Sequence, residues 1–260
     1  MTMLSTHGGA QDSLFVEGAG SLGEALAAEL GSRVHVNHRV DSIIRDGRGV
    51  SVLSGADRWQ ADAVIVSVPP PMAARIAHEP ALPERRRVLE QKTYMGSVYK
   101  AIAVYPTPFW RSRSSGEFLV LDGPGVAVFD SSAPGGPGHL CMLVGGPQAR
   151  RLDSLDVDQR REILLRPLVD QLGAQVLEPV DWHEKAWHRD EFAGGGYQAL
   201  FDLDCPDLHL PMSAEPVGRV YFAGSETATG HPGYFDGAIE AGQRAAAEVA
   251  RARHQPSLEC

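Results

Sequence analysis

Residues 220–247 read VYFAGSETATGHPGYFDGAIEAGQRAAA and decide the fold class. The apolar run at 220–223 predicts a strand, and the alanine-rich run at 237–252 predicts a helix. A loop rich in Gly, Ser and Thr joins them, so free backbone N–H groups and the helix dipole suit an anionic or electron-rich group there. The helix also carries small residues that let a flat ligand approach closely: Ala238, Ala241, Gly242 and Ala245. The same pattern fits a tightly packed terminal helix without a ligand.

Upstream, residues 14–68 alternate between strand-like and helical runs, as α/β folds do. We expect extended segments or strands at 14–16, 34–36, 40–44, 50–53 and 62–68, a helix at 22–30 and a hairpin turn at 45–49. The β-branched run at 62–68 is typical of a strand buried on both faces, and the prolines at 69–71 end it.

The middle of the chain has a different character. Residues 99–105 predict a strand, and many Gly, Pro and Ser residues surround short predicted strands at 118–121, 126–129 and 139–144. One amphipathic helix is predicted at 156–172, with Asp156 near its start and Gly173 just after its end. The sequence therefore indicates a discontinuous architecture, with α/β segments at both ends and a sheet-rich insertion between them.

The composition excludes several function classes. The chain has 260 residues, with 24 Lys and Arg against 33 Asp and Glu, and its net charge of −9 argues against binding to a nucleic acid backbone. No apolar run approaches the roughly 18 residues of a membrane span, and the N-terminus has no leader pattern. We therefore expect a cytoplasmic protein with no nucleic acid or membrane partner. Cys141, Cys205 and Cys260 are far apart and favour neither a disulfide framework nor a metal site.

One glycine motif has two interpretations. Residues 18–23, GAGSLG, match the dinucleotide-binding pattern G-x-G-x-x-G between a short predicted strand and a helix. However, the predicted strand has only three residues, and the carboxylate expected about 20 residues later would be Asp41, inside another predicted strand. The alternative, a glycine-rich start of a helix, fits the sequence better.

The segment at 220–247 resembles the C-terminal flavin-binding motif of the flavin-containing amine oxidases, the monoamine oxidase family. Other segments resemble this family in the same order: 8–11 (GGAQ) before the Gly18 loop, 63–70 (AVIVSVPP), 96–100 (GSVYK) before 108–110 (PFW), and 187–197 with FAGGGY at its end. The resemblance implies an α/β (α+β) fold. Residues 14–88 and 190–253 would belong to a discontinuous FAD-binding domain, and residues 89–189 to a mixed-sheet substrate domain with flanking helices.

The resemblance implies FAD as the cofactor and a small-molecule amine as the substrate, oxidised to an imine by hydride transfer to the flavin. Lys100 matches the lysine that holds a water near flavin N5. A lysine in an apolar strand must be paired, hydrated or functional, and a solvent-reaching lysine on an edge strand is the structural alternative. Tyr197 and Tyr234 match the aromatic pair that flanks the amine.

The resemblance also implies a set of cofactor contacts. Trp187 matches a tryptophan near the flavin ring, and the backbone at Val40 matches the position that meets the adenine. The residues expected around the rest of the flavin are Gly224, Ser225, Glu226, Thr227, Gly233, Tyr234 and Ala238. On this interpretation the glycines at 18–23 form only the turn and helix that precede the Val40 segment.

Three departures from the family pattern change the expectations. Gly196 stands where some members carry the cysteine that bonds the flavin, so we expect noncovalent FAD. His231 and Pro232 replace an aromatic and a small residue, which affects the expected substrate contacts. The family's first strand, its G-x-G-x-x-G motif and its ribose-binding glutamate have no counterpart before Gly8. We therefore expect a split oxidase that needs a separate N-terminal FAD-binding subunit, a homo-oligomer, or a fragment.

Two other functions remain open from the sequence. The chain could be a noncatalytic remnant or interaction subunit that folds without flavin. It could also be a related flavin oxidase or desaturase with a substrate that is not an amine. Lys100 and the tyrosine pair favour amines, because apolar polyenes need no aromatic cage for a nitrogen.

Overall fold

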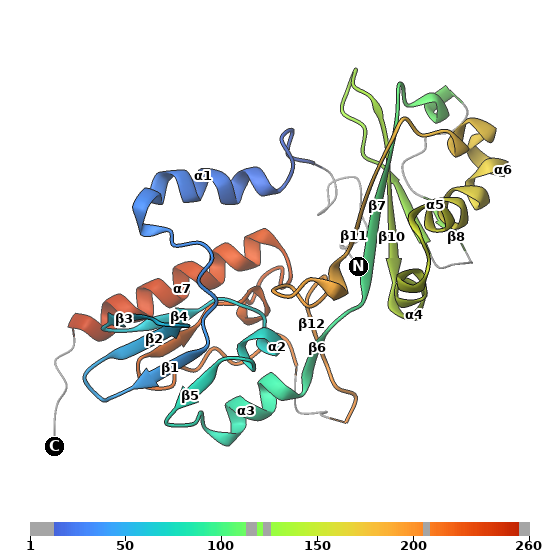
Figure 1. Cartoon of the computed structure of the whole chain (residues 1–260). Helices are drawn as coiled ribbons and strands as arrows, with labels where there is room; N and C mark the ends of the chain where they lie inside the picture. The colour runs from blue at the N-terminus through green and yellow to red at the C-terminus, as the bar shows by residue number, and fades with distance from the viewer. Residues whose placement is uncertain (1–12, 113–118, 122–125, 205–208, 255–260) are drawn as a thin grey trace. The chain divides into compact units, whose positions relative to one another are not determined.

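The computed structural model describes residues 13–112, 119–121, 126–204 and 209–254 (Figure 1). The chain divides into two compact units, each with its own hydrophobic core. Unit 1 comprises residues 1–36 and 97–186, and unit 2 comprises residues 37–96 and 187–260. Helices and mixed sheets occur together, which confirms the predicted α/β (α+β) class.

The centre of unit 1 is a five-stranded antiparallel sheet in the order β11-β7-β10-β9-β8. Its strands are β7 (Val98–Tyr105), β8 (Leu119–Leu121), β9 (Val126–Asp130), β10 (Gly138–Gly145) and β11 (Asp181–Ala186). Side chains of β7 alternate between a buried face and a half-buried face, as a strand with one face on a core requires. The strands predicted at 99–105, 126–129 and 139–144 are confirmed; residue 118 lies outside the described residues.

Short helices complete the core of unit 1. They are α4 (Gly146–Arg151), α5 (Val157–Leu165) and α6 (Val169–Leu172). Ala149 of α4 and leucines of α5 and α6 belong to one buried cluster with Ala101, Tyr105 and Met142 of the sheet. The single helix predicted at 156–172 is wrong, because a 3₁₀ turn at Arg166–Leu168 interrupts it. Pro167 lies in that turn and has no N–H to continue the helical ladder.

Helix α1 (Gly20–Leu30) confirms the helix predicted at 22–30, and none of its residues is buried. The strand predicted at 14–16 is wrong, because these exposed residues form no ladder with any described strand. The dinucleotide interpretation of residues 18–23 thereby loses the strand it needs. The predicted family segment at 8–11 lies outside the described residues.

Unit 2 contains three small sheets (Figure 1). Its strands are β1 (Ser42–Arg45), β2 (Val50–Ser54), β3 (Asp57–Ala61), β4 (Val64–Val66), β5 (Ala77–Glu79), β6 (Thr93–Met95), β12 (Ala199–Phe201) and β13 (Val220–Phe222). The orders are β3-β2-β1-β5, β12-β6 and β13-β4. The pairs β1–β5 and β13–β4 are parallel. Its helices are α2 (Pro70–Ala73), α3 (Glu84–Gln91) and α7 (Phe235–His254), so the predicted C-terminal helix is confirmed and starts slightly earlier.

Some predicted elements of unit 2 agree with the structure and others do not. The turn at 45–49 is confirmed, since the Asp46 carboxylate accepts the N–H groups of Arg48 and Gly49, each at 2.9 Å. Residues 34–36 form no strand, and β1 begins only at Ser42. The strand predicted at 62–68 is confirmed only as β4, and its burial on both faces is wrong. Ile65 is 39% exposed, so its face of β4 is not fully covered by the described residues.

None of the helices in the described part of the chain is long and apolar enough to cross a membrane. Cys141 is a buried free thiol in β10. The other two cysteines lie outside the described residues.

Candidate functional site

The candidate site in unit 2 starts where β13 ends and the chain turns toward α7. The turn contains a 3₁₀ segment at Ser225–Thr227. The Thr227 hydroxyl donates to the Gly224 carbonyl (2.7 Å) and accepts from Arg244 Nη2 (3.0 Å). The same Arg244 nitrogen donates to the Phe222 carbonyl (2.7 Å). Helix α7 therefore fixes both the end of β13 and the loop that follows it.

Glu226 lies inside this loop and is 3% exposed. Its Oε1 accepts the Ala199 N–H (3.1 Å), and its Oε2 lies 3.3 Å from the Ser225 hydroxyl. Its backbone carbonyl accepts the Met212 N–H (2.8 Å). The Glu226 side chain therefore bonds to the protein's own backbone and joins the loop to β12.

A second carboxylate holds the part of the loop that carries Tyr234. Glu240 of α7 accepts the Thr229 N–H (2.8 Å), the Thr229 hydroxyl (2.6 Å) and the Gly230 N–H (3.0 Å). The Thr229 hydroxyl and these N–H groups lower the pKa of Glu240. Tyr234 is half-buried, and Ala238 lies on an exposed part of α7.

Tyr197 stands just before β12 and is 69% exposed. The Gly196 N–H donates to the Gly96 carbonyl (2.9 Å), and a Cβ on Gly96 would lie 2.4 Å from the Gly196 carbonyl oxygen. Two backbones therefore approach each other more closely than any side chain would allow. Ala199 then pairs with Met95 in the β12–β6 ladder.

The segments that carry Tyr197 and Tyr234 meet at Gln198 and Gly233. Gly233 has φ +86°, and a Cβ there would lie 2.8 Å from Gln198 Oε1. That oxygen is buried and has no hydrogen-bond partner among the residues that the structure describes. Sequence reasoning missed Gln198 and Glu240. Only the position of Gln198 next to Tyr197 hinted at a supporting role.

The other residues expected in unit 2 lie elsewhere on it. Trp187 is 39% exposed and opens a 3₁₀ turn at Trp187–Arg189. Val40 packs against the apolar cluster formed by β1, β2, β4 and β13. Asp41 accepts the Gly55 N–H (2.7 Å) and an N–H of Arg39.

Lys100 belongs to unit 1, on the half-buried face of β7. Since β7 lies between β11 and β10, the edge-strand alternative for this lysine is wrong. Its cross-strand neighbours are Leu143 and Lys185, and sequence reasoning missed Lys185 because pairing partners are not visible in a single sequence.

The opposite face of β7 carries a polar network. The Glu184 carboxylate accepts from Tyr99, from Arg160 and from Trp182 Nε1, the last at 2.8 Å. Burial opposes the charge on Glu184, but these hydrogen bonds outweigh it and lower its pKa. Burial and the adjacent Glu184 carboxylate raise the pKa of Tyr99.

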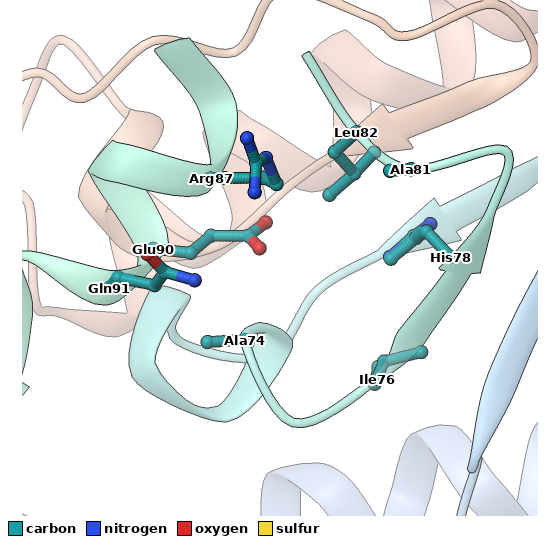
Figure 2. A pocket seen from close by; sticks show the side chains of 8 residues that line it. All are labelled: Ala74, Ile76, His78, Ala81, Leu82, Arg87, Glu90 and Gln91. Carbon is teal, nitrogen blue, oxygen red and sulfur yellow. The ribbon is translucent and has the colours of Figure 1, made fainter. Parts of the chain in front are cut away.

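Unit 2 also contains a cavity of about 120 Å³ beside β5 and α3 (Figure 2). Figure 2 shows His78 on one side of it, with Glu90 and Gln91 on the other. Burial, with the nearby charges of Arg45 and Arg86, lowers the pKa of His78 to about 4. None of the residues expected to bind substrate or cofactor lines this cavity.

Comparison with known proteins settles the family. The family model for flavin containing amine oxidoreductases matches residues 1–250. The chain belongs to this family. A relative from Mycobacterium tuberculosis, named as the flavin-containing monoamine oxidase AofH, is 39% identical over 250 residues, 95% of this chain and 54% of that protein. Flavin-containing amine oxidase B of Canis lupus familiaris is 34% identical over 96% of this chain and 49% of that protein.

Solved structures agree with this family membership. Cyclohexylamine oxidase from Brevibacterium oxydans IH-35A aligns with a TM-score of 0.83 at 30% identity, over 92% of this chain and 53% of that one. Wild-type putrescine oxidase bound to putrescine aligns with a TM-score of 0.83 at 33% identity, over 90% and 53%. The chain therefore spans about half the length of the flavin amine oxidases that it matches.

Proposed function

We propose that this chain forms the C-terminal part of an FAD-dependent amine oxidase that converts a small amine to its imine. The observation that carries the proposal is the meeting of the Tyr197 and Tyr234 segments at Gln198 and Gly233, beside the loop after β13. Two aromatic rings on segments held this way are suited to flank an amine nitrogen through their quadrupoles.

The residues of unit 2 that are expected to contact the cofactor fit a flavin. Trp187 and Tyr197 are partly exposed aromatic residues, which suit a flat ring system, and Ala238 is a small exposed residue of α7. The side chains of Glu226 and Thr227 hold the loop itself. We therefore propose that the backbone from Gly224 to Thr227, the Ser225 hydroxyl and the backbone at Gly233 and Tyr234 contact the cofactor. Since Gly196 offers no thiol, we propose noncovalent binding.

When bound, the flavin would accept the equivalent of a hydride from the carbon next to the amine nitrogen. We propose that Tyr197 and Tyr234 orient the neutral amine, and that Lys100 holds a water through its ammonium N–H groups. Water would then hydrolyse the imine. Val40 would contact the adenine end of the cofactor.

The domain assignment remains a proposal as well. We propose that residues 14–88 and 190–253 belong to the FAD-binding domain, and that residues 89–189 bind substrate. An N-terminal FAD-binding part, as a separate subunit or a preceding segment, or a second copy of the chain, would complete the cofactor site. The cytoplasmic location remains a prediction.

The visible absorption spectrum tests this function. The chain is purified alone and together with an N-terminal FAD-binding part, and amines are added without oxygen. A yellow preparation that an amine bleaches is expected. A colourless preparation in both cases would contradict the oxidase and favour a noncatalytic interaction subunit, whereas a yellow one that no amine bleaches would favour a different flavin substrate.

Two substitutions test the proposed residues. Lys100→Met should slow flavin reduction by at least about 10-fold while FAD stays bound, because it removes the ammonium that holds the water, and misplacement at a reacting centre costs up to about 100-fold. Tyr234→Ala should lower amine turnover more than FAD retention. Tyr94→Ala, on an exposed residue of β6, is the matched control. Unchanged reduction rates in both test variants would contradict the assignment.

A further inference from the structure

We propose that Glu226 and Gln198 are positioning residues that fix the position of Tyr197 relative to the Tyr234 loop. We call Glu226 and Gln198 together the tyrosine clamp. The inference rests on the proposed function and deepens it. Glu226 was expected to contact the flavin. Its hydrogen bonds assign it instead to the placement of a substrate-facing ring.

The first half of the clamp is the buried carboxylate. Glu226 Oε1 accepts the N–H of Ala199, which lies two residues after Tyr197 and opens β12. A buried carboxylate that accepts a backbone N–H makes a strong, directional bond, and removing it leaves the N–H unsatisfied. Glu226 thereby connects the Tyr197 strand to the loop after β13.

The second half is the contact between Gln198 and Gly233. The Gln198 side chain fills the space where a Cβ on Gly233 would stand, with Cβ and Oε1 at 3.2 and 2.8 Å from that point. Because Gly233 precedes Tyr234, this contact connects the two tyrosine segments directly. Among the described residues the buried Oε1 accepts no hydrogen bond, so packing rather than hydrogen bonding makes this contact.

The backbone is held on both sides of Tyr197. Tyr197 is 69% exposed, Ala199 is buried, and the Gln198 side chain between them contacts the Gly233 position. In this part of unit 2, Gly96 fixes that backbone before Tyr197, and Glu226 fixes it after Tyr197.

Hydrogen exchange of this chain tests the clamp without flavin. Glu226→Ala should speed exchange of the Ala199 amide by about 10-fold or more, while Glu226→Gln, which keeps an acceptor oxygen, should restore most of the protection. Gln198→Ala should speed exchange at residues 229–234, and Gln198→Met should not. Glu215→Gln, an exposed carboxylate of unit 2, is the control. If Gln198→Ala changes exchange only at 196–201, the coupling is contradicted.

Flavin reduction in the completed oxidase is the second measurement. Glu226→Ala and Gln198→Ala should each lower the reduction rate by about 10- to 100-fold with the flavin spectrum retained, since misplacement by about 1 Å has effects of this size. Glu226→Gln should return to within about 3-fold of the wild-type rate. If it is as slow as Glu226→Ala, the carboxylate acts through its charge, and the positioning role is wrong. Changed exchange without any amine-driven reduction would support the clamp and contradict the oxidase.

Discussion

At the scale of single residues, charged side chains of unit 2 hold backbone groups. Glu226, in the loop between β13 and α7, accepts the Ala199 N–H of β12. Glu240 of α7 accepts the Thr229 and Gly230 N–H groups of the same loop, and Arg244 donates to the Phe222 carbonyl at the end of β13. A hydrogen bond to a buried charged group such as Glu226 contributes about 1.5–3 kcal/mol. Three side chains therefore hold this loop and the elements next to it.

His78 gives a prediction about pH. Its pKa is about 4 in the folded chain, below its ordinary value of 6.5, so the unfolded chain binds the proton more readily. The stability that neutral His78 contributes is complete above pH 6.5 and is lost as the pH falls toward 4. The loss amounts to at most about 3 kcal/mol.

The measurement is urea unfolding of wild type and His78→Gln at pH 7 and pH 4.5. The variant should lose less stability between these two pH values than the wild type does. His209→Gln, on an exposed histidine, is the control. Equal losses in His78→Gln and wild type would contradict the buried, neutral state of His78.

At the scale of elements, the polar network on β7 and β11 gives a second stability prediction. Glu184 of β11 accepts hydrogen bonds from β7, from α5 and from its own strand, and its side chain is 20% exposed. Glu184→Ala leaves Tyr99, Arg160 and Trp182 without this acceptor, and we expect a loss of about 2–4 kcal/mol in the free energy of unfolding. Glu184→Gln should lose less.

Chemical denaturation checks this expectation, with Glu178→Ala, on an exposed residue of the same unit, as the control. A loss below about 0.5 kcal/mol for Glu184→Ala would show that water replaces the carboxylate. In that case the network would add nothing to the docking of α5 on the sheet.

The sequence predicted elements well where local patterns were strong. The strand at 99–105 and the C-terminal helix are both long and clearly patterned, and both are confirmed. The strand predicted at 14–16 was wrong because a three-residue apolar run forms a strand only when a partner strand is present. The prediction of one continuous helix at 156–172 was wrong because it followed the helical periodicity and gave too little weight to Pro167.

The candidate site was only partly visible in the sequence. The motif at 220–247 identified the segments of Tyr197 and Tyr234, but not what holds them together. Gln198 and Gly233 meet across 35 residues of chain, and a single sequence carries no signal for such a contact. Likewise, the partners of Glu226 follow from the register of β12, which depends on long-range pairing.

At the scale of the whole molecule, the chain alternates twice between its two units. It belongs to unit 1 up to residue 36, returns to it at residue 97, and leaves it again after residue 186. Residues 97–186 begin with β7 and end with β11, and these two strands pair with each other. Ala186 stands opposite Tyr99 in that ladder, so the segment 97–186 enters and leaves unit 1 at one point (Figure 1).

This arrangement predicts that residues 97–186 fold without the rest of the chain. All five strands of the antiparallel sheet and helices α4, α5 and α6 lie within this range, together with a continuous buried core. Domains with adjacent ends and their own core tolerate excision, and about 90 residues is enough for a stable core. The isolated segment should unfold cooperatively in urea, and Leu168→Ala, at a fully buried residue, should lower its stability by about 2–5 kcal/mol. Val157→Ala, at an exposed residue of α5, is the control. A non-cooperative transition, or equal stability of the two variants, would mean that this sheet needs contacts from outside the segment to hold its core together.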